Sequence, residues 1–322
     1  MQIRRDVRSV VLGVVAFILT LQIVAALVVL VATYIENASA IAHISENLDG
    51  NTTEVLTNYV LSAYNEAMDE YLGLGMIIGM LLGLPWLFLI RGKRFITSDI
   101  PRVNSKAKFG TLFILLLFVF GIQGFMALLL LVFEPLFNQG GGSLTDVLDE
   151  STTSLAITVW GALYIALIGP ICEELVFRGA VMRKLERYGS NFAIIVSSLL
   201  FALYHMILFQ AVFAFFIGII FAYTAGRFSL KWAILLHMVN NGMAVLLTYV
   251  DNEILAAAIG FTYMASLIVM VVVIIAKRNL FVAQKIAGAP SEPKVFSRAF
   301  MSPWLIGYII FTGFISILLV FA

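Results

Sequence analysis

Three groups of polar residues interrupt apolar stretches of this 322-residue sequence. The first holds two acids and an arginine, the second ends in a histidine, and the third holds a histidine and a carboxamide. The three groups are Glu173-Glu174-Leu175-Val176-Phe177-Arg178, Phe201-Ala202-Leu203-Tyr204-His205 and His237-Met238-Val239-Asn240-Asn241. Ionisable groups are costly to place in hydrocarbon, and where they occur there they usually serve a function. These residues are therefore the candidates for chemistry.

The spacing within the groups predicts which side chains act together. Residues four apart lie on one face of a helix. Glu174 can therefore pair with Arg178 along their helix, whereas Glu173 points about 100° away. His237 and Asn241 share a face in the same way. We expect Arg178 to hold one acid while the other faces the reacting centre.

The chemistry that needs this set is hydrolysis. A carboxylate in a low-dielectric site can take a proton from water, and Asn241 can donate to the oxyanion that forms when water attacks a carbonyl. His205 and His237 can orient that water or ligate a metal. Two histidines and a glutamate form a known kind of zinc site, but the sequence has no His-Glu-x-x-His motif. Binding of Zn²⁺ by His205 and His237 stays open.

Composition places these residues in a membrane protein. The chain is 61% hydrophobic and 12% charged, with a mean hydropathy of +1.02, whereas soluble domains carry about 25% charged residues. We expect an all-α polytopic membrane helix bundle, integral and multi-pass, in the cell membrane. The bilayer is then a partner, and no nucleic acid is expected. The single Cys172 excludes an intramolecular disulfide framework.

About nine membrane helices, or eight at the lowest count, are predicted within a single integral membrane domain, residues 1–322. A transmembrane helix needs about 20 apolar residues. The expected spans are Val10–Tyr34, Leu72–Ile90, Phe109–Phe133, Ser154–Tyr188, Asn191–Met206, Ala211–Gly226, Trp232–Tyr249, Ile254–Ala276 and Pro303–Phe321.

Charge alternates between the segments that join these spans. The basic segments are the N-terminus, 91–108, 179–190, 227–231 and 277–300. The acidic segments are 36–71, 134–153 and 251–253. Basic loops face the cytoplasm. We therefore expect a cytoplasmic N-terminus, and we expect 36–71 to be an outer loop with some helix.

Glycines are placed where the spans need close packing or a kink. Gly75, Gly79 and Gly83 recur every four residues in the second span and make one smooth face for a neighbouring helix. Gly169-Pro170 comes just before the acidic pair. We expect it to kink its helix and to free a backbone carbonyl.

The depths in the membrane that the sequence predicts for the two histidines disagree. If the fifth span starts near Asn191, His205 lies ~20 Å from the cytoplasmic edge, whereas His237 lies ~9 Å from its own edge. Tilt, a later helix start or local thinning of the bilayer would bring the two depths together.

The three groups resemble the motifs of the CPBP intramembrane proteases, which include the type II CAAX prenyl endopeptidases and the bacteriocin-processing or self-immunity proteins, also called the Abi family. Glu173-Glu174-x-x-x-Arg178, Phe201-x-x-x-His205 and His237-x-x-x-Asn241 follow the family's order on successive helices. The resemblance covers about Ala156–Val245. We expect the catalytic helix core at 154–249.

The resemblance implies an intramembrane endopeptidase, with metalloprotease chemistry as an open variant, that cuts a peptide bond near the membrane in a cavity open to the cytoplasm. It implies that Glu173 activates a water. The residues that it assigns to the site are Glu173, Glu174, Arg178, His205, His237 and Asn241. The substrate is then a membrane-associated peptide or protein, and a prenylated C-terminus and a bacteriocin-like precursor both stay open.

Two other functions remain as alternatives. A proton-coupled membrane transporter would use the acids and histidines as a relay, but it predicts inverted repeats, and no convincing internal repeat is visible in the sequence. A non-catalytic membrane scaffold would keep the fold as a partner-binding module. A scaffold would tolerate changes at Glu173 and His237 that abolish proteolysis in a protease.

Overall fold

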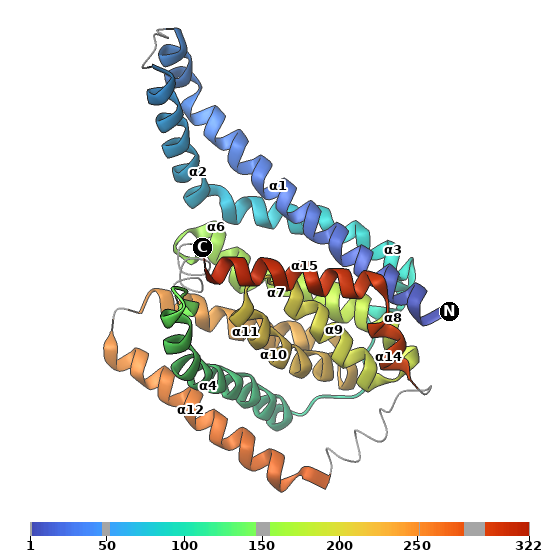
Figure 1. Cartoon of the computed structure of the whole chain (residues 1–322). Coiled ribbons are helices and arrows are strands. Elements are labelled where there is room, and N and C mark those ends of the chain that lie inside the picture. The colour runs from blue at the N-terminus through green and yellow to red at the C-terminus, as the bar shows by residue number, and fades with distance from the viewer. Residues whose placement is uncertain (1, 47–51, 146–154, 251, 280–293, 322) are drawn as a thin grey trace.

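The described part of the chain is built from helices. The computed structural model describes residues 2–46, 52–145, 155–250, 252–279 and 294–321. Over these ranges it contains no strand, only one isolated backbone bridge between Val103 and Ser229. Backbone polar groups in lipid must be satisfied within the chain itself, which a helix achieves. The predicted all-α polytopic bundle is confirmed (Figure 1).

The helices follow one another in the order α1 to α15, with some numbers unused. The long elements are α1 (Gln2–Glu46), α2 (Thr52–Gly83), α4 (Phe109–Gln139), α9 (Ser190–Tyr204), α10 (Leu208–Arg227), α11 (Leu230–Thr248), α12 (Glu253–Ala276) and α15 (Pro303–Val320). The short ones are η1 (Leu84–Trp86), α3 (Leu87–Arg91), η2 (Phe95–Asp99) and α14 (Val295–Phe300). One further continuous helix, Val159–Tyr188, changes type along its length. Its parts are α6 (Val159–Leu163), η3 (Tyr164–Ile168), α7 (Gly169–Glu174), η4 (Leu175–Met182), α8 (Arg183–Leu185) and η5 (Glu186–Tyr188).

Eight helices among the described residues are long and apolar enough to cross a membrane. This is the lower end of the predicted eight to nine, and the difference is α9. With 15 residues, α9 is about 22 Å long, which is short of a ~30 Å hydrocarbon core. His205 caps its C-terminus, and the next residue, Met206, has a positive φ of 56° that breaks the helix. His205 therefore lies at the break between α9 and α10, and not inside a full span.

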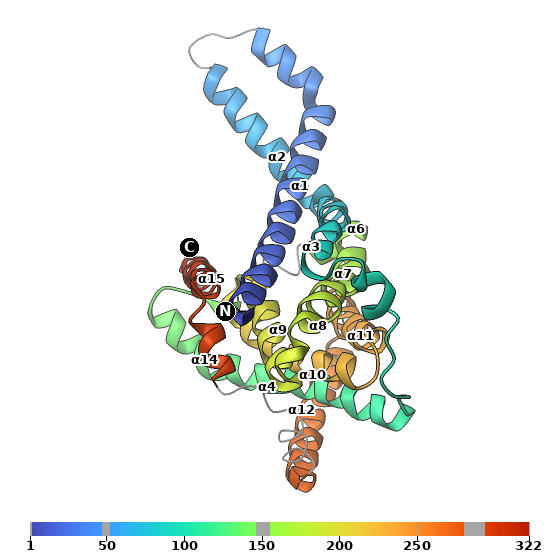
Figure 2. The ribbon, with the colours of Figure 1, turned by 90° about the vertical axis from the view of Figure 1, so that its right-hand side faces the viewer.

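Helices α1 and α2 form a hairpin that projects beyond the other helices (Figures 1 and 2). At 45 residues, α1 is about 67 Å long. Segment 36–71, expected as an outer loop with some helix, is helical at 36–46 and 52–71, and its residues 47–51 lie outside the described part. The reason is local: neither helical stretch contains a glycine or proline to end it.

The smooth face predicted on α2 packs directly on the backbone of α1. A Cβ added at Gly79 would lie 2.7 Å from the Leu21 carbonyl oxygen, and one at Gly75 would lie 2.8 Å from Ala25 Cα. Both contacts are with backbone atoms, which cannot turn aside as a side chain can. These glycines therefore set how closely the two helices approach.

This packing predicts that Gly79→Ala destabilises the protein. We expect its free energy of unfolding to fall by about 1–3 kcal/mol, as in other overpacked cores, because α2 must move away from α1. Gly260→Ala on α12 is the matched control, since nothing lies within 4 Å of a Cβ added there. Thermal unfolding of both variants in the same detergent measures the effect. Equal midpoints would show that the close approach contributes nothing.

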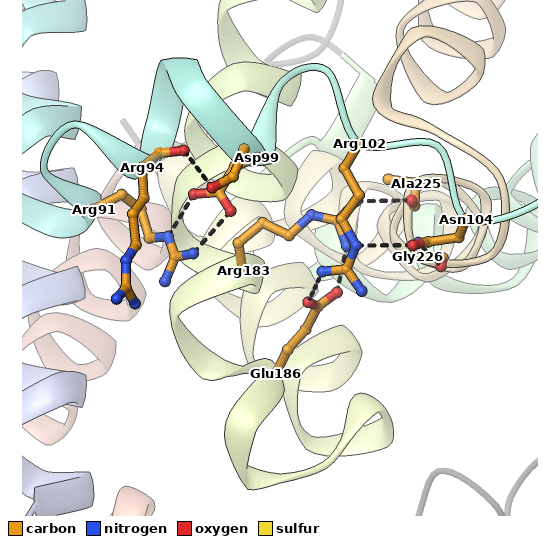
Figure 3. Close-up of polar contacts among 10 residues, drawn as sticks. Arg91, Arg94, Asp99, Arg102, Asn104, Arg183, Glu186, Ala225 and Gly226 are labelled. Carbon is orange, nitrogen blue, oxygen red and sulfur yellow. Dashed lines mark hydrogen bonds and ion pairs between the residues drawn. The ribbon is translucent and has the colours of Figure 1, made fainter.

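Segments that the charge pattern predicts on one side of the membrane meet at one end of the bundle. Arg102, in the loop before α4, donates to Glu186 at 2.8 Å (Figure 3). Lys184 Nζ lies 3.6 Å from Asp6 Oδ1 at the start of α1. Three of the predicted basic segments, the N-terminus, 91–108 and 179–190, thus lie at the same end. That this end faces the cytoplasm stays a prediction from the basic residues.

Candidate active site

The central helix, Val159–Tyr188, carries the acidic pair and two stretches of π-helix, η3 and η4. At the end of η3 the Gly169 N–H bonds to the Tyr164 carbonyl, five residues earlier. In that register the next donor would be residue 170, and its acceptor would be the Ile165 carbonyl. Pro170 has no N–H. The carbonyl freed by the Gly-Pro pair is therefore that of Ile165.

Glu174 joins the central helix to α11. Its Oε1 atom accepts a hydrogen bond from Arg178 Nη1 at 2.7 Å and another from His237 Nδ1 at 3.0 Å. The pairing with Arg178 that the spacing of four predicts is confirmed. Both side chains of this pair are completely buried. Glu174 therefore serves as an anchor inside the protein.

Two aromatic rings, a carboxylate and a backbone carbonyl hold Arg178. Its guanidinium lies over the rings of Phe201 and Phe221, 4.3 Å and 5.6 Å from their centroids, and Nη2 donates to the Gly218 carbonyl at 3.0 Å. A Cβ at Gly218 would come within 3.0 Å of Nη2, so the absence of a side chain there makes room for this bond. A cation without water needs such a set of partners. Arg178 thus balances the charge of Glu174.

His237 has a defined orientation between the two acids. Its Nδ1–H donates to Glu174, so in the neutral ring Nε2 is left as an acceptor. Nε2 lies 3.6 Å from Glu173 Oε2. The ring stacks on Phe221, with centroids 4.7 Å apart. Hydrogen bonding and stacking together direct Nε2 toward Glu173.

His205 is oriented by the end of its own helix. Its Nδ1 bonds to the Phe201 carbonyl, four residues earlier, at 2.9 Å. A carbonyl only accepts, so Nδ1 carries the proton and Nε2 is again the acceptor. Both histidines therefore offer the same kind of nitrogen.

Four of the predicted residues, Glu173, His205, His237 and Asn241, line one cavity of about 230 Å³. The other two, Glu174 and Arg178, lie behind it and hold His237 in place. Much of the remaining wall is apolar, and α1 and α2 contribute to it. The structure thus brings all six predicted residues together, although they come from three separate segments of the chain. Ser154, the first residue of the expected core 154–249, lies outside the described residues.

Several polar residues of the cavity were not assigned a role from the sequence. They are Gln22, Tyr164, Tyr204, Gln210 and Asn240. A polar side chain within an apolar span was the signal available for them. Asn240 even belongs to the third motif, but helix periodicity alone does not show whether it faces the cavity.

Asn241 is fixed by the carbonyl that Pro170 leaves free. Its Nδ2 donates to Ile165 O at 3.0 Å, and its Oδ1 accepts from Asn240 Nδ2 at 3.0 Å. A carboxamide –NH₂ has two hydrogens, and the bond to Ile165 uses one of them. The other is available to the cavity that Asn241 lines.

The metal-binding alternative can be tested on the donor atoms. His205 and His237 both offer Nε2, which suits zinc. A catalytic zinc site needs three protein ligands, and the described residues contain no group of three His, Cys, Asp or Glu placed to hold a metal ion. Within the described residues the donors thus fall short of the three protein ligands of a catalytic zinc site, and we assign no step to a metal.

Comparison with known proteins identifies the segment that carries this cavity. Residues 155–243 match the family model described as type II CAAX prenyl endopeptidase Rce1-like. No curated protein and no solved structure matches the chain. The match agrees with the family that the motifs resemble, and with eight helices apolar enough to cross a membrane it makes this an integral, multi-pass membrane protein. Residues 155–243 are thus similar to the Rce1-like, type II CAAX prenyl endopeptidase family over the segment that carries the cavity.

Proposed function

We propose that this protein is an intramembrane endopeptidase in which Glu173 activates the water that cleaves a peptide bond. The observation that carries the proposal is the facing pair of Glu173 Oε2 and His237 Nε2, 3.6 Å apart at the edge of a cavity. A carboxylate oxygen and a neutral imidazole nitrogen are both acceptors. A water that donates one hydrogen to each satisfies both, and its oxygen lone pairs then face the cavity.

The first step is addition of this water to the scissile carbonyl. As the new C–O bond forms, Glu173 takes one proton from the water, acting as general base. The carbonyl π electrons move to its oxygen, which becomes an oxyanion, and Asn241 donates its remaining N–H to it. His237 keeps its tautomer throughout, because Glu174 accepts from Nδ1.

The second step breaks the C–N bond. The oxyanion reforms a carbonyl, and Glu173 passes its proton to the leaving nitrogen, which departs as an amine. The carboxyl product keeps the oxygen of the water. Glu173 is then ionised again and can bind the next water.

The substrate we propose is membrane-associated and apolar near the cleaved bond. The wall contains Ile18 and Leu21 from α1, Met76 from α2 and Phe213 and Ile217 from α10, which favours apolar side chains over charged ones. A prenylated C-terminus is supported by the description of the matched family. Cytoplasmic presentation of that C-terminus follows if the basic end of the bundle faces the cytoplasm.

Cleavage by the purified protein tests the proposal. The probe is a fluorogenic peptide ending in an S-farnesylated cysteine and three further residues, offered to the protein in lipid nanodiscs. We expect release of the C-terminal tripeptide, identified by its mass. The same peptide without the farnesyl group measures how much the lipid contributes. No cleavage of either peptide would contradict the proposal, and proton flux without cleavage would favour a transporter.

A chelator distinguishes catalysis by a bound water alone from catalysis that needs a bound metal. Because the described ligand set does not fit a zinc site, we expect cleavage to continue at an unchanged rate in excess 1,10-phenanthroline. Metal analysis of the purified protein gives the second readout, with less than one equivalent of zinc expected. Inhibition that added zinc reverses would show that His205 and His237 hold a metal.

A further inference from the structure

A line of side-chain hydrogen bonds runs from α4 to the cavity. Gln123 Nε2, in the middle of α4, donates to Asn240 Oδ1 at 3.0 Å. Asn240 Nδ2 donates to Asn241 Oδ1, and Asn241 Nδ2 donates to Ile165 O, both at 3.0 Å. Gln123 lies outside residues 155–243. The line therefore begins on a helix that the family match does not cover.

The direction of these bonds is set by the acceptor at their end. A carboxamide has an oxygen that accepts and a nitrogen that donates, so turning it by 180° exchanges the two. Ile165 O can only accept, and this places the nitrogen of Asn241 toward it. The oxygen of Asn241 then faces Asn240, which must present its nitrogen there and its oxygen toward α4. Gln123 supplies the donor that this direction requires.

We propose that Gln123 is a positioning residue for peptide hydrolysis: it holds Asn240, and through it the Asn241 carboxamide, with an N–H directed at the cavity. The inference rests on the proposed function, in which that N–H receives the oxyanion. Oxyanion donors act by being oriented before the reaction begins. Asn240 is 4% exposed, and its oxygen accepts from Gln123 Nε2. Loss of Gln123 leaves Asn240 free to turn, and Asn241 then keeps only its bond to Ile165 O and loses the bond that holds its oxygen.

Gln123→Met tests this role because it keeps the length of the side chain and removes the donor. Deleting an oxyanion donor costs about 10²–10³ in kcat, so we expect disorder of the donor to lower kcat by about tenfold, with KM changed by less than about twofold. Thr312→Val on α15 is the matched control: it removes a buried hydroxyl that donates to Tyr308 O at 2.8 Å, far from this line in sequence. We expect wild-type kcat from the control.

A double variant separates positioning from a general structural effect. If Gln123 acts through Asn241, Gln123→Met lowers kcat no further once Asn241→Ala is present. A further drop by the same factor, or an unchanged kcat in the single variant, overturns the inference. If Gln123→Met does not fold, Gln123→Leu serves, since it removes the same donor with a shorter apolar side chain, and kcat is again expected to fall.

The outcomes for the two proposals differ. If the wild-type protein does not cleave the farnesylated peptide, or if Glu173→Gln cleaves it at the wild-type rate, the proposed function fails and this inference fails with it. If the wild type cleaves and Glu173→Gln does not, wild-type kcat in Gln123→Met overturns only the role of Gln123.

Discussion

Glu173→Gln is expected to lower kcat for cleavage of the farnesylated peptide by about 10²–10⁴. The substitution keeps the shape of the side chain but removes the negative charge and the ability to take a proton from water. Glu173 lines the cavity with 6% of its surface exposed. Bulk water therefore cannot replace it as the base. Single-turnover kinetics in nanodiscs measure the loss.

The control for this experiment is folding. Glu173 makes no hydrogen bond to another side chain within the described residues, and the imidazole Nε2 of His237 lies 3.6 Å from its carboxylate. We therefore expect Glu173→Gln to unfold at the wild-type temperature or above it, because a buried acid is replaced by a neutral amide. Cleavage at the wild-type rate by this folded variant would show that Glu173 is not the base.

Arg178→Met is expected to produce the largest loss of stability. It leaves the Glu174 carboxylate completely buried without the cation that balances it. Breaking a buried pair by removing one partner typically costs about 3–5 kcal/mol. Thermal and denaturant unfolding of the purified protein measure this change, and the amount of protein recovered from the membrane gives a second readout if the variant is too unstable to purify.

Two further variants show whether charge is the cause. Adding Glu174→Gln to Arg178→Met removes the unbalanced acid, so most of the stability should return. Arg102→Met breaks a pair with Glu186 whose two side chains are 44% and 23% exposed, and such pairs contribute about 0–1 kcal/mol. If the double variant is as unstable as Arg178→Met, then packing of the arginine between Phe201 and Phe221, and not its charge, holds the site.

Much of the fold could be predicted because it follows from local sequence. Length and hydropathy along the chain give the long spans, and the glycine repeat of α2 gives the face that packs on Leu21 of α1. Contacts within one helix are equally predictable, as Glu174 and Arg178 show, since helical geometry alone brings residues four apart together. The one span that was expected and is too short, α9, ends where Met206 adopts a left-handed backbone conformation, and neither a glycine nor a proline marks that position.

The candidate site, too, was predictable in part and decided in part by the folded structure. Its residue types and their order were visible in the sequence, because charged and polar groups are rare and costly within apolar helices. What only the tertiary structure decided is how they face one another: His237 reaches both acids from α11, His205 stands at a helix end, and Asn241 takes the carbonyl of Ile165. These contacts join different helices, whose relative rotation and depth depend on packing across the whole bundle. No periodicity within a single helix records that information, and so the link from Gln123 to the cavity appears only in the folded chain.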